Sequence, residues 1–103
     1  MMLLTKEIKA ALPALYTTEA TKAEEKIAVV KFFNPSGAGT WYGVEFDGQD
    51  TFFGYVESPL GPDCSEWGYF SLSELASVRG RFGLGIERDL HFKPTRIAEL
   101  LKD

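Results

Sequence analysis

Hydrophobic residues near the start of the chain recur at helical spacing. They are Leu4, Ile8, Ala11, Leu12 and Leu15. This spacing gives one apolar face to a helix. Thr5 is placed to cap the first turn, and Pro13 should end the helix near residue 12. The following residues, 17–26, are polar and have no apolar period, so we expect an exposed loop there.

The middle of the chain changes to short runs of β-branched and aromatic residues, a pattern typical of strands. Segments that contain proline, glycine, asparagine or aspartate separate these runs. The expected strands are residues 27–33, 40–46, 51–57, 67–70 and 88–92. Hairpin-length connections join the first three strands, so we expect them to pair antiparallel.

Two more helices are predicted in the second half of the chain. Ser71 and Glu74 have the spacing of a capping box, and Gly80 is placed to end the helix that they open. A last helix opens at residues 94–95. Its buried face carries Ile97, Leu100 and Leu101.

These elements predict a single α+β domain over residues 1–103. We expect one antiparallel sheet of about four to five strands, with two to three helices mainly on one face. Eleven of the fourteen aromatic residues lie between Phe32 and Phe70. The sheet therefore has more aromatic surface than one core face needs.

The composition narrows the classes of function. The net charge is −4, with −6 over residues 1–78 and +2 over residues 79–103. An acidic chain lacks the clustered Lys and Arg that duplex DNA binding needs, although the basic end keeps a small local patch open. No apolar run is long enough for a membrane helix, and the start is too short for a signal peptide. We expect a cytoplasmic protein.

Cofactor and metal chemistry are not expected. Cys64 and His91 are each the single residue of their type, so the chain has no zinc ligand set at a usual spacing. The glycines at 80, 83 and 85 follow a helix and lack the order of a dinucleotide fingerprint. They indicate a helix stop and a tight loop. The acidic turn around Asp47 and Asp50 lacks the ligand spacing of a calcium loop.

Several segments together resemble a known bacterial family. They are residues 50–56, 68–75 and 86–92, with residues 3–8 and 12–13 at the start. The chain is similar over nearly its whole length to the family catalogued as domain of unknown function 2958. The resemblance implies a cytoplasmic accessory protein of a plasmid, phage or other mobile element. It implies no activity and no catalytic residues.

The pairing of the two central strands sets their faces. With a four-residue loop at 47–50, Tyr42 lies opposite Tyr55 and Val44 opposite Phe53. Gly43 then faces Gly54, and such a glycine pair weakens a sheet unless something approaches closely. That neighbour could be a helix of the same chain, a partner or a ligand. In this register Tyr42, Val44, Phe46, Phe53 and Tyr55 share one face. The other face carries Trp41, Gly43, Glu45, Phe52, Gly54 and Val56.

Three main hypotheses of function follow, beside a fourth, an acidic decoy that mimics nucleic acid, which the modest net charge of −4 does not favour. The first is an interaction module that binds a protein partner, or a second copy of itself, through an aromatic surface. The residues expected to form that surface are Trp41, Gly43, Phe52, Gly54 and Tyr55. The second is binding of single-stranded nucleic acid, with aromatic rings stacking on bases and a basic segment on phosphates. That segment comprises Arg79, Arg81, Arg88, Lys93 and Arg96.

The third hypothesis is an enzyme. Asp89 and His91 are two residues apart on an expected strand, so they share a face and could orient an imidazole as a general base. No Ser or Cys nucleophile is identifiable beside them. A thiolate at Cys64 is disfavoured because Asp63 and Glu66 place negative charge beside it. We expect a binding module rather than an enzyme.

Overall fold

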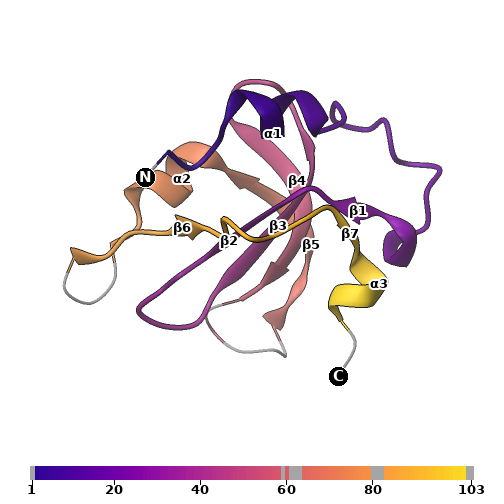
Figure 1. Ribbon diagram of the computed structural model, residues 1–103. Helices are drawn as coiled ribbons and strands as arrows, with labels where there is room; N and C mark the ends of the chain where they lie inside the picture. The colour runs from indigo at the N-terminus through magenta and orange to yellow at the C-terminus, as the bar shows by residue number, and fades with distance from the viewer. Residues whose placement is uncertain (1, 59, 61–63, 80–82, 102–103) are drawn as a thin grey trace.

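The computed structural model describes residues 2–58, 60, 64–79 and 83–101. Figure 1 shows a twisted sheet with short helices around it. The helices are α1 (Lys6–Ala11), α2 (Leu72–Ser77) and α3 (Ile97–Leu100), with a 3-10 turn η1 (Ala23–Glu25). The main-sheet strands are β2 (Val30–Phe33), β3 (Thr40–Phe46), β4 (Thr51–Glu57), β5 (Glu66–Ser71) and β6 (Glu87–Arg88). The smaller sheet has β1 (Ile27–Ala28) and β7 (Thr95–Arg96). The predicted α+β class is confirmed.

The main sheet is antiparallel throughout, in the order β5-β4-β3-β2-β6. Strands β3, β4 and β5 follow one another along the chain and pair as neighbours. Strand β6 arrives from the second half of the chain and pairs with β2. Among the described strands, β5 therefore has a neighbour on one side only.

Two predicted strands differ from the observed ones. The run 27–33 is divided, because residues 27–28 pair with β7 while residues 30–33 pair with β3. The expected strand 88–92 is only residues 87–88. It ends because the Asp89 carboxylate accepts from the backbone N–H of His91 and the Asp89 carbonyl from that of Phe92, which closes a turn. Thr95 lies in β7, so the last helix begins two residues later than expected.

A β-bulge at Val44 corrects the predicted register. Tyr42 pairs with Tyr55 and Gly43 with Gly54, as expected. Beyond the bulge the partner of Phe53 is Glu45, not Val44. The extra residue shifts the alternation by one, so Phe46 changes face. Its ring packs 4.4 Å from that of Phe52, in the main core.

The main core lies on the sheet face that α2 covers. It is formed by Leu12, Val30, Phe32, Phe46, Phe52, Phe70, Leu75 and Ile86. Phe52 sits at its centre, with no exposed surface, and stacks on Phe70 at 5.0 Å between ring centroids. Gly43 belongs to this core as well. A Cβ there would meet the side chains of Val30 and Phe52, so these side chains fill the space above the glycine.

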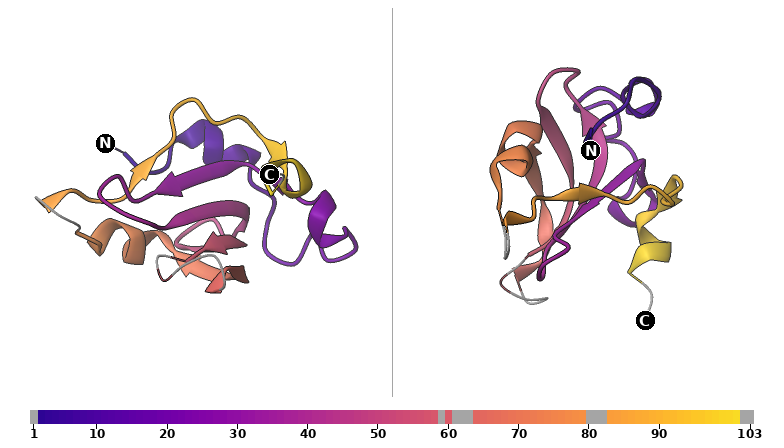
Figure 2. Two further views of the ribbon diagram at one scale, coloured as in Figure 1. Left: turned by 90° about the horizontal axis from the view of Figure 1, so that it is seen from below. Right: turned by 60° about the vertical axis from the view of Figure 1, so that its left-hand side comes forward.

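The opposite face carries a smaller core of Ala28, Tyr42, Val44 and Ile97. It forms where α3 packs on the sheet, and α2 and α3 lie on opposite sides in the right-hand view of Figure 2. We call this the α3 face. Because α3 is only four residues long, it covers part of that face. The two sheet faces are therefore covered to different extents.

The helix caps combine local and distant residues. Thr5 and Ser71 accept from the backbone N–H groups of Ile8 and Glu74, as the sequence predicts. Asp50, on the β3–β4 turn, adds a second cap to α2. Its carboxylate accepts from the N–H and the hydroxyl of Ser73, at 2.8 and 2.9 Å.

Within the described residues, no helix has the length and apolar content to cross a membrane.

Candidate interaction surface

Four aromatic side chains form a continuous group on the α3 face, where β4 and β5 pair. We call Phe53, Tyr55, Trp67 and Tyr69 the aromatic cluster. Phe53 contacts Trp67 at 5.7 Å and Tyr69 at 5.2 Å between ring centroids. Tyr55 meets Trp67 edge-on at 5.6 Å. The pairs arise from register, because Phe53 lies opposite Tyr69 and Tyr55 opposite Trp67.

The aromatic cluster is open to solvent along β5. Tyr69 is 57% exposed, and the other three rings are partly exposed. Tyr55 and Trp67 also pack against the smaller core, which holds one side of the cluster to the protein. Rigid aromatic rings at a sheet edge offer large contact area with little conformational entropy to lose. Aromatic residues are enriched at the centres of protein interfaces.

A buried carboxylate fixes the loop beside the aromatic cluster. Glu45 is 3% exposed and lies on β3, on the face that the cluster shares. Its oxygens accept from the backbone N–H of Tyr16 at 2.8 Å and of Thr18 at 3.0 Å. The Thr18 hydroxyl also donates to Glu45, and the Lys26 ammonium donates to that hydroxyl at 3.0 Å.

The environment favours the charged form of Glu45. Burial raises the pKa of its carboxyl, but the hydrogen bonds from Thr18 and Tyr16 and the charge of Lys26 outweigh burial. The pKa is therefore held below its ordinary value. These bonds also hold Tyr16 at a φ of 71°, in the left-handed region that large residues rarely adopt.

The loop extends the aromatic surface. The Tyr16 side chain is 61% exposed and hydrogen-bonds the Tyr69 hydroxyl, a contact that raises the pKa of Tyr69. Burial and the charges of Glu45 and Glu19 raise it further. Tyr16 thus joins the aromatic cluster from a segment far away in the sequence, and the acidic groups of Glu45 and Glu19 lie close to Tyr69.

The residues expected to form the binding surface are divided between the faces. Tyr55 is in the aromatic cluster. The expected position of Phe52 on the surface is corrected, because its side chain is fully buried in the main core. Trp41 packs against that same core and is partly exposed, whereas Gly43 and Gly54 are both buried.

Sequence reasoning missed the larger part of the cluster. Trp67 and Tyr69 alternate around Gly68 in a short strand, which predicts that they share a face. That signal was available. Which face they share, and that β5 is a terminal strand, depended on the pairing with β4.

The expected basic segment is spread over several elements. Arg79 donates to two carbonyl oxygens at the end of α2, at 2.7 Å each. Arg96 forms ion pairs with carboxylates of η1 and α3. Arg88 lies on β6 and donates to a backbone carbonyl near the N-terminus, and Lys93 is exposed between β6 and β7. Arg81 and the expected helix stop at residue 80 are outside the described residues.

The other candidate sites are also placed. The Asp89 carboxylate accepts from the backbone N–H of His91, at 2.9 Å, and pairs with Lys31 at 3.7 Å. It is thus engaged with a turn and a lysine. Asp47 accepts three backbone N–H bonds in its own turn, which lower the pKa of its carboxyl. Cys64 is exposed. The described residues contain no group of three or more metal-binding side chains.

The fold and the surface define a small α+β domain with an aromatic cluster at one edge of its sheet. The chain belongs to the family described as protein of unknown function DUF2958, whose model matches residues 3–101. The expected family resemblance is confirmed. No curated protein and no solved structure matches the chain.

Proposed function

We propose that this domain binds an extended segment of a partner protein along β5, with the aromatic cluster as the contact surface. The observation that carries the proposal is the position of the exposed rings beside a terminal strand. Among the described strands, β5 pairs only with β4, so its outer edge can accept backbone hydrogen bonds from an added strand. Alternate side chains of that strand would then pack on Trp67 and Tyr69.

The charges near the cluster favour a basic partner. Glu57 ends β4, and Glu45 and Glu19 lie close enough to Tyr69 to raise its pKa. The whole chain carries a net charge of −4. Complementary charge speeds association and disfavours partners of the same sign. The same carboxylates oppose a phosphate backbone, so protein binding is favoured over single-stranded nucleic acid.

The experiment compares variants on and off the surface. The wild type, Trp67→Ala, Tyr69→Ala and the control Leu90→Ala serve as baits in quantitative pull-downs from the host cell. Leu90 is a matched control because it is 62% exposed and lies on the turn after β6. A protein kept by the wild type and the control, but lost by both aromatic variants, is taken forward.

Binding of that protein is then measured with a synthetic peptide of its interacting segment. Trp67→Ala should weaken the affinity by about 30-fold, the effect of an interface hot spot. Amide shifts on titration should concentrate on residues 66–71. Equal affinity for wild type and Trp67→Ala would refute the proposal. The proposal would also be refuted if a labelled oligothymidylate bound more tightly than the peptide, with a steep salt dependence and a lower affinity for Trp67→Ala.

A further inference from the structure

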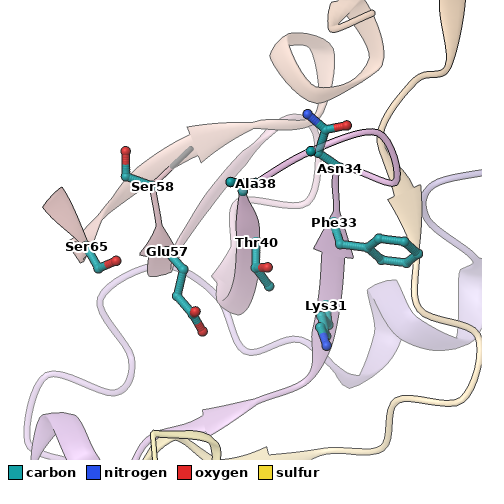
Figure 3. A pocket seen from close by; sticks show the side chains of 10 residues that line it. Lys31, Phe33, Asn34, Ala38, Thr40, Glu57, Ser58 and Ser65 are labelled. Carbon is teal, nitrogen blue, oxygen red and sulfur yellow. The ribbon is translucent and has the colours of Figure 1, made fainter. Parts of the chain in front are cut away.

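A polar hollow lies on the α3 face, next to the aromatic cluster. Its volume is about 430 Å³. Figure 3 shows its side chains, which come from β2, β3, β4 and the segments that follow β2 and precede β5. The lining residues are Lys31, Phe33, Asn34, Gly37, Ala38, Gly39, Thr40, Glu57, Ser58 and Ser65.

The sheet register brings the polar groups to one face. Phe33 lies opposite Thr40, and Thr40 opposite Glu57, so their side chains form a row across three strands. The next row contains Lys31 and Tyr42, which are also a registered pair. The hollow is therefore built in part on paired strands and not on loops alone.

Glu57 is the charged residue of the hollow whose carboxylate can still accept hydrogen bonds from a ligand. Tyr42 hydrogen-bonds to it through its hydroxyl. Burial, followed by the charge of Glu57, raises the pKa of Tyr42 to about 12, so the hydroxyl stays a donor. Lys31 lies in the same hollow, but its ammonium is paired with Asp89, at 3.7 Å. The carboxylate of Glu57 thus has a neutral donor and remaining acceptor capacity.

Ser65 supplies a second, independent observation. Its hydroxyl oxygen is buried, and it has no hydrogen-bond partner among the described residues. In Figure 3 this oxygen points toward the Glu57 side of the hollow. A buried hydroxyl without a partner costs free energy, which a bound donor would recover. The hydroxyl of Thr40 lines the same space.

We infer that the hollow receives the guanidinium or ammonium group of a basic side chain from the bound segment, with Glu57 and Ser65 as acceptors. This inference rests on the proposed function, and it names the chemistry of the partner. Glu57 lies two residues beyond Tyr55 on β4, which places the hollow about 7 Å from the aromatic cluster. A strand added to β5 can thus place one side chain on the aromatic cluster. The side chain two residues further along lies on the same face and can point toward the hollow.

The distance from an added strand to Glu57 requires a long basic side chain. An added strand lies about 10 Å from β4, because neighbouring strands are about 4.8 Å apart. Only the long side chains of arginine and lysine extend across Ser65 to Glu57 from that position. An anionic side chain would meet Glu57 and Asp89 beside a lysine that is already paired.

The test uses the full chain and agmatine, a free alkyl guanidinium, as the probe. Backbone amide shifts of the ¹⁵N-labelled protein are followed while agmatine is added at constant ionic strength. Saturable shifts are expected at Thr40, Glu57 and Ser65. Glu57→Gln should weaken agmatine binding by about tenfold, the loss of a charged hydrogen bond. Ser65→Ala should weaken it less and leave thermal stability equal or slightly higher, because the buried hydroxyl has no hydrogen-bond partner among the described residues.

Controls separate the two proposals. Glu66→Gln, at an exposed position of β5, should keep the agmatine shifts, and so should Trp67→Ala. Unchanged agmatine binding in both Glu57→Gln and Ser65→Ala would overturn the inference. Saturation of the same amides by glucose or inorganic phosphate, or no agmatine shift at all, would overturn it too. In those cases the partner affinities of the Trp67 variant still decide the proposed function on their own.

Discussion

Glu45→Gln should destabilise the protein although it changes only one atom. The carboxylate now accepts from two backbone N–H groups, of Tyr16 and Thr18, at 2.8 and 3.0 Å. Glutamine keeps one carbonyl oxygen and replaces the other with an NH₂ donor. One N–H group would then face a second donor, in a site where Glu45 is 3% exposed. Water cannot readily replace the lost acceptor there.

The magnitude follows from the lost bond and the buried donor. A hydrogen bond to a charged group contributes about 1.5–3 kcal/mol, and a buried donor without a partner adds a desolvation cost. We expect a net loss of about 2–4 kcal/mol in the free energy of unfolding. In a domain of this size that corresponds to a fall in Tm of roughly 10–25 °C.

Urea unfolding at several pH values is the assay. The pKa of Glu45 is held below its ordinary value of 4.5, so the stabilisation is complete above that value. It is lost as the pH falls through the lower pKa of the folded state. The difference between wild type and Glu45→Gln should therefore be full at neutral pH and should shrink in acid. Tyr16 and Thr18 amides should exchange faster in the variant at neutral pH.

Glu66→Gln is the matched control for this experiment. Glu66 is exposed on β5, so its substitution should change stability by less than about 0.5 kcal/mol. Equal unfolding midpoints for Glu45→Gln and the wild type would refute the reasoning. A difference that stays constant from neutral to acidic pH would show that the carboxylate charge does not hold the loop.

Three substitutions, with Gly68→Ala as a comparison, test the core, the sheet and the caps by urea unfolding. Ser71→Ala should cost about 1 kcal/mol, because the N-cap acceptor is lost; unchanged stability would show that this cap contributes nothing. Gly54→Ala should cost about 4 kcal/mol or more, since its Cβ would lie 1.8 Å from the Tyr42 carbonyl oxygen, whereas Gly68→Ala has open space and should cost far less. Phe52→Ala should cost about 3–5 kcal/mol, and a loss under 1 kcal/mol would contradict its central place in the core.

Short-range signals in the sequence were enough to predict the parts of the fold that depend on neighbouring residues. The capping serine at 71 and the β3–β4 hairpin were predicted within a residue or two. The pairs Tyr42–Tyr55 and Gly43–Gly54 were predicted as well. Caps, alternation and hairpin loops act over a few residues, so their signals are complete in a short stretch of sequence.

Contacts between distant parts of the chain determine which residues are buried and which surface is free. The bulge at Val44 directs the Phe46 side chain into the main core. The buried carboxylate of Glu45 accepts hydrogen bonds from a loop that is distant in the sequence. Phe52 was expected on a surface and is core, whereas Trp67 and Tyr69 line the open edge. A bulge, a terminal strand and a buried charge depend on partners far along the chain. Their free energy arises only when those partners meet, so a local pattern does not contain it.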